Sequence, residues 1–267
     1  MSPNLKERYG PWALVAGATE GIGAAYSRQL AAQGFNLVMV ARHAEPLAAL
    51  AEEIEATQCV KVRALVLDLA TADFMVPLKV ALDGLDVGLC IYNAAASNLG
   101  YFTNVPLANK MQEIDVNVRG PMLLLDHIIP GLIGRGQGGV ILMSSLAGFQ
   151  GGSVVATYAA TKSFLRVLAE GLWAELKPQG VDVLACVAGA TDTPKYQATK
   201  PDGKVPTQRA EDVAALALAS LGKKPVVISG LASKAISFLF GRLLPKALVV
   251  RIMASQLDRI YGPDYKG

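Results

Sequence analysis

The chain has 267 residues, of which 52% are hydrophobic and 18% charged, and its formal net charge at pH 7 is +3. This is ample apolar material for the core of one large α/β domain. The small net charge gives no electrostatic footprint for nucleic acid, so nucleic-acid binding is not indicated. Cys59, Cys90 and Cys186 are spaced too widely for a metal site or a disulfide framework, which fits a reducing compartment. Cys90 and Cys186 lie in apolar runs, where we expect them to pack in the core.

The ends of the chain favour a soluble, cytoplasmic protein. About ten polar residues precede the first apolar run, so we expect neither a signal peptide nor an N-terminal membrane anchor. The longest apolar region, 226–240, is interrupted by Lys234. It falls short of the roughly 20 apolar residues that span a bilayer.

Segments typical of strands and helices alternate along the chain. Short apolar runs predict strands at 12–16, 36–41, 61–68, 87–94, 138–145, 181–189 and 224–230. Helical patterns between them run to Gln33, over 45–56, from about Thr71, through a long stretch broken near Pro130, and over 158–178. Apolar strands separated by helices predict a parallel sheet with helices on both faces. Right-handed crossovers make this a Rossmann-type, doubly wound α/β fold of about seven strands, with 1–267 as one domain.

Three glycines follow the first predicted strand in 15-VAGATEGIG-23, at positions 17, 21 and 23. Glycines at a strand-to-helix turn allow a tight bend and let the backbone approach a pyrophosphate, which the helix N-terminus then binds. The spacing is GxxxGxG rather than the GxGxxG of the usual fingerprint. A plain turn is the alternative, but the position after the first strand favours a dinucleotide loop.

The end of the second strand indicates which dinucleotide the loop would bind. An acidic residue there holds the ribose 2′-hydroxyl of NAD, whereas a basic residue accommodates the 2′-phosphate of NADP. Here the strand ends at Arg42, and no acidic residue follows until Glu45. A guanidinium can bind a phosphate through two hydrogen bonds. Glu20 in the glycine loop opposes a phosphate, and Arg42 could be solvated, but the balance favours NADP over NAD.

Six ordered motifs together resemble the short-chain dehydrogenase/reductase family over residues from about 10 to 230. They are AGATEGIG at 16–23, Asp68 after the third strand, YNAA at 92–95, DVNVRG around Asn117, MSSLAG around Ser145 with YAATK at 158–162, and VAGATDT at 187–193. The departures from the family pattern are Ala16, Tyr92, Ala95 and Ala188. All four lie at supporting positions in turns and strand ends, so the reactive groups are intact.

The resemblance implies the residues of a cofactor site and a catalytic site. The implied cofactor contacts are Gly17, Thr19, Gly21, Ile22, Gly23, Arg42, Asp68, Leu69, Asn93, Ala94, Tyr158, Lys162, Gly189, Thr191 and Thr193. The implied catalytic residues are Asn117, Ser145, Tyr158 and Lys162. Lys162 would hydrogen-bond the nicotinamide ribose, and Asn117 would hold a water that relays protons from Lys162.

The chemistry of these residues suits ketone reduction, in which a nicotinamide supplies the hydride and the protein delivers a proton. Tyr158 is the expected general acid/base, although an unperturbed tyrosine has a pKa of about 10. Lys162 lies one helical turn further along, where its charge would favour the phenolate. Ser145 would donate a hydrogen bond to the substrate oxygen. The Tyr–Lys spacing alone is also common on helix surfaces; Ser145, Asn117 and the glycine loop favour the catalytic interpretation.

The substrate pocket is expected to be mostly apolar. Its predicted wall comprises 96–102, 146–156 and the loop 194–206, which belongs to a long polar segment, 194–208, that we interpret as a lid or as disordered. The side chains expected there are Leu99, Tyr101, Phe102, Leu146, Phe149 and Val154, and the proposed substrate contacts are Ser145, Phe149 and Tyr158. The glycine loop and the tail also resemble the steroid and long-chain 3-oxoacyl reductase branch of the family, which implies a lipid-like ketone or alcohol.

The apolar tail 231–267 is predicted to form two amphipathic helices divided at Pro245. It could cover the pocket, form an oligomer interface or lie on a membrane surface, in that order of preference. The resemblance also implies a homodimer or homotetramer. His43 and His127 lack partner ligands, so no metal is expected. Two further functions stay open: a non-catalytic NADP-binding sensor or scaffold, and a membrane-surface interaction protein.

Overall fold

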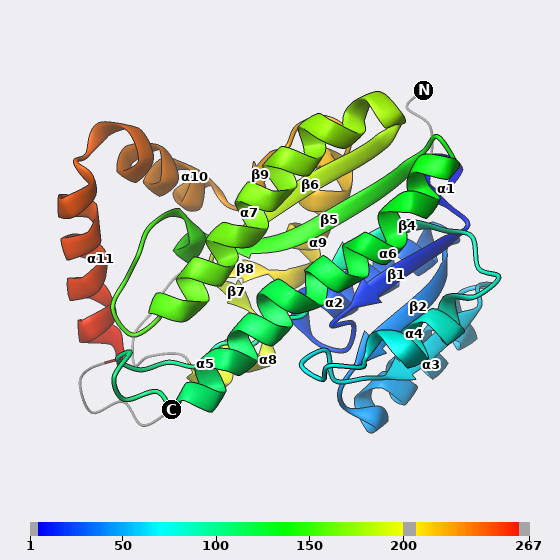
Figure 1. The fold of residues 1–267 in the computed structure, drawn as a ribbon, viewed down its shortest axis with the longest axis horizontal. Coiled ribbons are helices and arrows are strands. Elements are labelled where there is room, and N and C mark those ends of the chain that lie inside the picture. The colour runs from blue at the N-terminus through cyan, green and yellow to red at the C-terminus, as the bar shows by residue number, and fades with distance from the viewer. Residues whose placement is uncertain (1–4, 200–206, 262–267) are drawn as a thin grey trace.

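A seven-stranded parallel sheet forms the centre of the computed structural model, which describes residues 5–199 and 207–261 (Figure 1). The strand order is β3-β2-β1-β4-β5-β6-β9. The strands are β1 Trp12–Ala16, β2 Asn36–Ala41, β3 Val62–Val66, β4 Val87–Tyr92, β5 Gly138–Ser145, β6 Val181–Ala188 and β9 Val226–Ile228. The chain first winds outward from β1 to β3 and then from β4 to β9, so the order reverses between β1 and β4. This confirms the predicted doubly wound sheet.

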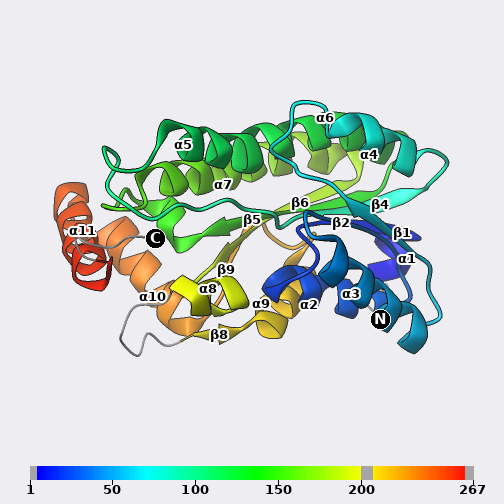
Figure 2. The same ribbon diagram turned by 90° about the horizontal axis from the view of Figure 1, so that it is seen from below.

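Helices cover both faces of the sheet, as Figure 2 shows. One layer contains α2 Gly21–Ala32, α3 Ala44–Thr57 and α9 Ala210–Ser220; the other contains α4 Met75–Leu82, α5 Leu107–Ile114, α6 Gly120–Gly134 and α7 Ala156–Leu176. Alternate residues of β1 supply the two cores: Ala13 and Val15 pack with the α2 layer, and Leu14 and Ala16 with the α7 layer. Both faces of a strand are buried in this way because parallel sheets are covered on both sides. Two further helices are short: α1 Leu5–Tyr9 precedes β1, and α8 Pro194–Thr199 follows β6.

The buried cysteines confirm one prediction, and the helix containing Pro130 corrects another. Cys90 and Cys186 are buried within β4 and β6, while Cys59 is exposed. The helix predicted to break near Pro130 instead continues as α6 to Gly134. Pro130 lies in the last two turns of α6. The one backbone hydrogen bond that a proline cannot make is therefore lost near the C-terminal end of the helix, where the last carbonyl groups lack helical partners in any case.

The irregularity in this region lies earlier, in a π-helical turn, η1, at Asp115–Arg119. The buried hydroxyl of Tyr92 donates a hydrogen bond to the carbonyl oxygen of Val116 at 2.5 Å. Gly120 makes room for this ring, because a Cβ there would lie 2.4 Å from the Tyr92 oxygen. Tyr92, one of the departures from the family pattern, thus supports the turn that contains Asn117.

The last two segments of the fold are the polar loop and the tail. The loop begins as α8, and β7 Thr191–Asp192 pairs with β8 Gln208–Arg209; the part of the predicted lid at 200–206 lies outside the described residues. The tail forms α10 Leu231–Phe238, a π-helical turn η4 Leu239–Leu243, and α11 Lys246–Tyr261, so the predicted division at Pro245 is confirmed. Both helices lie at one end of the molecule (Figures 1 and 2). Within 5–199 and 207–261, every helix is too short or too polar to cross a membrane.

Candidate active site

A cavity of about 840 Å³ lies at the carboxyl ends of the strands, and the tail helices form part of its wall. Residues from the glycine loop and from the ends of β2, β4, β5 and β6 line it. Ligands of doubly wound sheets bind at this edge, where the strand order reverses. The predicted site residues that line the cavity are Gly17, Thr19, Ile22, Arg42, Asp68, Leu69, Asn93, Ala94, Ser145, Phe149, Tyr158, Lys162, Gly189, Thr191 and Thr193.

The glycine loop packs backbone against backbone. Gly17 has a φ of +79°, and a Cβ on it would lie 2.7 Å from the Cα of Ala94. A Cβ on Gly23 would lie only 1.8 Å from the carbonyl oxygen of Gly17. Asn93 fixes that same oxygen by donating a hydrogen bond at 2.8 Å. Gly21 and Gly23 do not line the cavity; they allow the close packing that shapes it.

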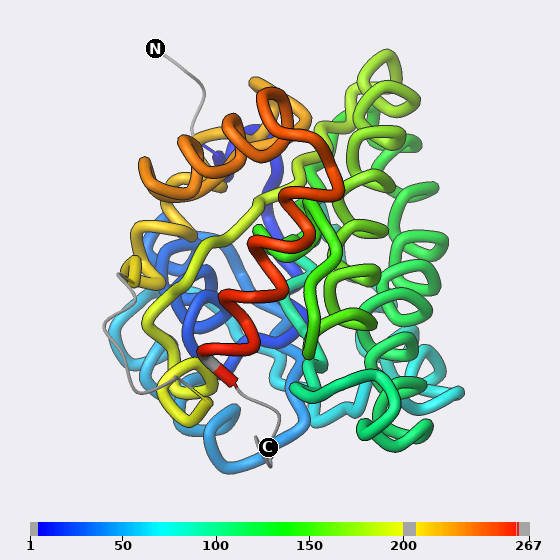
Figure 3. Tube along the Cα trace, turned by 90° about the vertical axis from the view of Figure 1, so that its left-hand side faces the viewer, coloured from blue at the N-terminus to red at the C-terminus, as the bar shows by residue number. Residues whose placement is uncertain are grey.

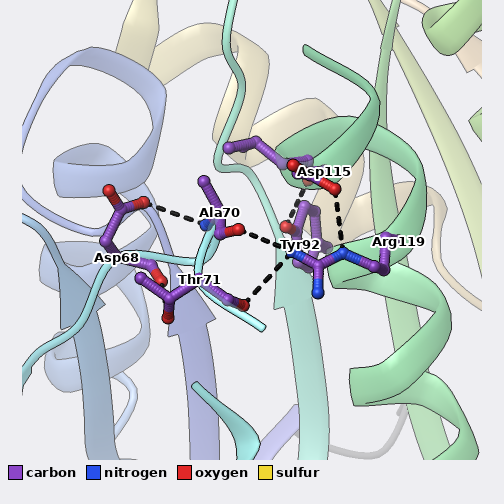
Figure 4. Close-up of polar contacts among 7 residues, drawn as sticks. Asp68, Ala70, Thr71, Tyr92, Asp115 and Arg119 are labelled. Atoms are coloured by element: carbon purple, nitrogen blue, oxygen red, sulfur yellow. Dashed lines mark hydrogen bonds and ion pairs between the residues drawn. The ribbon is translucent and has the colours of Figure 1, made fainter. Parts of the chain in front are cut away.

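Asp68, in the loop after β3, also lines the cavity, and Figure 4 shows the contacts that support this loop. The Asp68 carboxylate accepts a hydrogen bond from the backbone N–H of Ala70 at 2.9 Å. Arg119 donates to the carbonyl oxygen of Ala70 at 2.5 Å and to that of Thr71 at 3.3 Å, and it pairs with Asp115 at 2.9 Å. Arg119 therefore ties the Asp68 loop to the π-helical turn η1.

Ser145, Tyr158 and Lys162 meet in the cavity from two elements. Ser145 ends β5, and Tyr158 and Lys162 lie one turn apart on α7. The Ser145 and Tyr158 side chains both line the cavity, and Ser145 lies close enough to Tyr158 to affect its pKa. The Nζ of Lys162 lies 5.7 Å from the centroid of the Tyr158 ring and donates to the carbonyl oxygen of Met143 at 2.8 Å. Lys162 is buried and Tyr158 is partly buried, and both side chains line the cavity instead of the outer surface of α7.

Burial dominates the protonation of this pair. It lowers the pKa of Lys162 to about 7, with the charge of Lys195 as a second cause. Burial raises the pKa of Tyr158, the hydrogen bond from Ser145 opposes that rise, and the charge of Glu113 adds to it. Desolvation opposes the expected lowering of the Tyr158 pKa by Lys162, and a lysine with a pKa of about 7 is only partly charged at neutral pH.

Asn117 is fully buried and does not line the cavity. Its side-chain amide donates to the carbonyl oxygen of Ala96 at 2.8 Å and to the Thr161 hydroxyl at 3.0 Å, and its side-chain oxygen accepts from the Ala96 N–H at 2.8 Å. Asn117 thereby joins the segment after β4 to α7. The predicted water relay through Asn117 stays a prediction.

The substrate side of the cavity is lined by residues from three segments. Leu99, Leu146 and Phe149 line it as expected, whereas Tyr101, Phe102 and Val154 do not. The tail supplies further side chains that the sequence analysis did not name: Ile236, Ser237, Leu239, Phe240, Met253, Gln256, Leu257 and Tyr261. The spacing of 253, 257 and 261 is that of one helix face and could have identified them. Of the three interpretations of the tail, the structure supports the pocket cover.

Polar contacts fasten the tail to the rest of the wall. The Asp258 carboxylate accepts hydrogen bonds from Ser153 at 2.8 Å and from Tyr101 at 3.1 Å. Lys246 donates to the carbonyl oxygen of Phe149 at 2.9 Å. We refer to these contacts as the tail latch. Tyr101 therefore holds the wall in place instead of lining it.

Two charged residues close to Tyr158 and Lys162 were not identified from the sequence. Glu113 on α5 is 1% exposed and accepts hydrogen bonds from the backbone and side chain of Asn98. Lys195 lines the cavity and donates to the carbonyl oxygen of Ala95 at 3.4 Å. Burial lowers the pKa of Lys195, and the charge of Arg42 adds to this. Neither residue lies in a motif, and only the position of Lys195 directly after TDTP could have pointed to it.

A family model described as short chain dehydrogenase matches residues 11–204, the part of the chain that contains the glycine loop and all four predicted catalytic residues. The chain belongs to the short-chain dehydrogenase family. This confirms the resemblance inferred from the motifs, and the family is one of oxidoreductases.

Two of the similar curated proteins are named for steroid or very-long-chain acyl substrates, and a third is named as inactive. A 7beta-hydroxysteroid dehydrogenase of Clostridium sardiniense is 35% identical over 85% of this chain and 88% of its own. A very-long-chain 3-oxoacyl-CoA reductase of Aspergillus clavatus is 36% identical over 75% of this chain and 59% of its own. An inactive hydroxysteroid dehydrogenase-like protein 1 of Rattus norvegicus is 28% identical over 93% of this chain and 76% of its own.

Solved structures share the fold closely. A structure described in work on 7beta-hydroxysteroid dehydrogenase stereoselectivity superposes with a TM-score of 0.89 at 31% identity, over 94% of this chain and 99% of that one. A short-chain dehydrogenase from Sphingobium yanoikuyae, solved in complex with NADPH, has a TM-score of 0.78 at 28% identity, over 86% of this chain and 92% of that one.

Proposed function

We propose that this protein is an NADP-dependent oxidoreductase that interconverts a ketone and a secondary alcohol on a bulky, steroid-like or 3-oxoacyl-like substrate. Tyr158 serves as the general acid/base. The observation that carries the proposal is the meeting of Ser145, Tyr158 and Lys162 in one cavity that also receives the glycine loop and an apolar wall. The side chains on one side suit a dinucleotide, and those on the other suit an apolar ketone.

The proton chemistry follows from the burial of Tyr158. A bound reduced nicotinamide supplies the hydride, and the chain must supply a proton to the substrate oxygen. The raised pKa of Tyr158 keeps its hydroxyl protonated at neutral pH, which is the state that donates a proton to a ketone. Ser145 lies beside Tyr158 in the cavity, and its single O–H would turn to the same substrate oxygen and donate a hydrogen bond there.

Lys162 links this pair to the cofactor side. With a pKa of about 7 it is partly charged at neutral pH, so it can accept and return a proton near Tyr158. Its Nζ now donates to the carbonyl oxygen of Met143. An ammonium retains further N–H groups that could reach a ribose hydroxyl.

The residues present fit NADP. A Cβ at Gly17 or Gly23 would collide with backbone, so glycine at these positions allows the tight turn that leads into the N-terminus of α2, where a pyrophosphate can bind. Arg42 lines the cavity at the end of β2, where a 2′-phosphate would be held, and Lys195 adds a cation. Glu20 also lines the cavity and would oppose a phosphate, but Arg42 and Lys195 outnumber it. The NADPH complex of the Sphingobium yanoikuyae relative supports the same choice.

The substrate class follows from the wall opposite the glycine loop. Leucine, phenylalanine and methionine side chains dominate there, from the segment after β5 and from the tail. Such a wall recognises shape and apolar area and not charge. The steroid and very-long-chain acyl substrates in the names of the relatives are of this kind.

A non-catalytic NADP-binding sensor or scaffold is the alternative function, and one of the relatives is named as inactive. Against it stands the retention of Ser145, Tyr158 and Lys162 together in the cavity. A protein that only binds the cofactor would need none of their proton chemistry.

A panel of ketones tests the proposal directly. The purified protein is mixed with NADPH or NADH and with steroid ketones, 3-oxoacyl thioesters or small ketones, and loss of the reduced nicotinamide is followed by its absorbance. We expect oxidation of NADPH in preference to NADH, with the larger apolar ketones as the better substrates. Binding of NADPH without turnover on any ketone would support the sensor or scaffold instead.

We also propose that the protein is a homodimer or homotetramer. Large apolar side chains are exposed on neighbouring helices α5, α6 and α7: Leu107, Met111, Ile114, Met122, Leu123 and Val167. Exposed apolar patches of this kind mark association surfaces, and a self-complementary contact is the commonest form. Light scattering after gel filtration would give a dimer or tetramer mass, and Leu107→Glu combined with Met111→Glu should shift it to the monomer.

A further inference from the structure

The outer face of α10 combines apolar and cationic side chains. Leu231, Lys234 and Phe238 follow one another at spacings of three and four, which places them along one side of the helix. All three are exposed, Phe238 to 56%. The opposite side of the same helix contains buried Ser233 and cavity-lining Ser237. The helix therefore has a second, outward face that the pocket does not explain.

This pattern continues through the rest of the tail. Leu243 in η4 is 62% exposed, and Leu248 on α11 is also exposed. Arg242 and Arg251 are exposed beside them in the sequence. We call the exposed side chains of Leu231, Lys234, Phe238, Arg242, Leu243, Leu248 and Arg251 the tail face. Figure 3 shows that α10 and α11 lie on the same side of the molecule.

The charge of this region has one sign. Between Asp212 and Asp258 the sequence contains no Asp or Glu, and its charged residues are Lys223, Lys224, Lys234, Arg242, Lys246 and Arg251. A second copy docked through the same face would bring these cations against their own kind without an acidic partner. An anionic surface complements them.

We propose that the tail face docks on an anionic phospholipid surface. Exposed aromatic and leucine side chains beside lysines and arginines are the composition of helices that lie in a membrane interface. Helices α10 and α11 would lie on the bilayer, since no helix in the described parts of the chain can cross it. The apolar side chains enter the headgroup region, and the cations face the anionic headgroups.

The position of the tail suggests what docking would do for catalysis. This step rests on the proposed function. Ile236, Phe240 and Leu257 of the same segment line the cavity. A lipid surface beneath the tail face would bring membrane-dissolved ketones next to the cavity wall. The substrate would then pass from lipid to cavity without crossing water.

The test is co-sedimentation of the full-length protein with vesicles of phosphatidylcholine, alone or mixed with phosphatidylglycerol. We expect partition onto the mixed vesicles, weakened by salt. Lys234→Glu with Arg242→Glu should lower the partition by about fivefold or more for each cation at low salt. Phe238→Ser with Leu243→Ser should lower it about tenfold or more.

Matched controls come from α4, on another part of the surface, where Val76, Lys79 and Val80 are exposed. Lys79→Glu with Val80→Ser should leave the partition unchanged. Turnover of a small soluble ketone and the thermal unfolding midpoint should be the same in all variants, which separates a failure of docking from a failure of the fold or of the proposed function. Absence of vesicle binding, equal binding by the tail-face variants, or conversion of a dimer to a monomer by them would overturn the proposal.

Discussion

The two ends of the cavity are built from different materials. At the cofactor end, backbone packs on backbone: a Cβ on Gly23 would lie 1.8 Å from the Gly17 carbonyl, and one on Gly17 would lie 2.7 Å from Ala94. At the substrate end, side chains of the tail form the wall; Asp258 holds it through Ser153 and Tyr101, and Lys246 through the Phe149 carbonyl. Backbone contacts admit almost no substitution, whereas a wall of apolar side chains can be exchanged piece by piece. Cofactor binding is therefore constrained at one end of the cavity, whereas substrate preference can change at the other through substitutions in the wall.

Tyr158 and Lys162, the proposed catalytic pair, line the same cavity, and Lys162→Met should have the largest effect. We expect kcat to fall by roughly 10²–10⁴, because the proton donor loses its partner. We also expect the variant to be more stable at pH 6. The folded-state pKa of Lys162, about 7, lies below the unfolded value of 10.5. Burying the charged lysine thus opposes folding fully below pH 7, and this penalty fades as the pH rises toward 10.5.

Thermal unfolding of Lys162→Met and the wild type across pH 6 to 10 measures the second effect. The gain should be larger at pH 6 than at pH 10 by roughly 2 kcal/mol or more, and it should shrink steadily as the pH rises toward 10.5. Lys223→Met, at an exposed lysine, serves as the control. A gain that does not change with pH would contradict the burial of a titrating ammonium.

Gly23→Ala tests the rigidity of the cofactor end. The added methyl group must displace the Gly17 carbonyl, so the NADPH dissociation constant should rise roughly 10- to 100-fold. Fluorescence titration with NADPH measures it. Gly131→Ala in α6 is the control, since a Cβ there meets nothing within 4 Å. Unchanged binding in Gly23→Ala would show that the loop can adapt.

Arg42→Ala should change the dissociation constants of NADPH and NADH to different extents. Loss of a charge-assisted contact to the 2′-phosphate should weaken NADPH about tenfold or more. NADH lacks that phosphate, so its dissociation constant should stay the same. Parallel titrations with both dinucleotides give the ratio. An equal loss for both would mean that Arg42 acts on the loop and not on the phosphate.

Asp258→Ala tests the substrate end and should have the smallest effect. Removing the acceptor of Ser153 and Tyr101 loosens the tail latch, so KM for a bulky ketone should rise about threefold. A small ketone does not need the tail wall, and its kinetics should not change. Asp126→Ala, at an exposed carboxylate of α6, provides the comparison. If both ketones respond equally, the latch serves the fold as a whole.

The same contrast explains what could be predicted from the sequence. Strand positions followed from apolar runs, and Gly17, Tyr158 and Lys162 from spacings that backbone geometry and helix periodicity impose. The tail side chains that line the cavity were not named, because many apolar residues satisfy such a wall equally well. Glu113 accepts a hydrogen bond from Asn98, and its charge raises the pKa of Tyr158. Both partners are distant from it in the sequence, so no local sequence pattern predicts these interactions. The continuation of α6 past Pro130 could not be predicted, because a proline is tolerated near a helix end and the position of that end was not known from the sequence.

The central claim is that the Tyr158 hydroxyl delivers the proton beside a bound cofactor. The most direct measurement is single-turnover oxidation of NADPH by Tyr158→Phe with a steroid ketone, together with an NADPH titration of the same variant. We predict that the NADPH dissociation constant stays within about threefold of the wild type while the turnover rate falls by roughly 10²–10⁴. A turnover rate close to that of the wild type, with the cofactor bound, would contradict the claim.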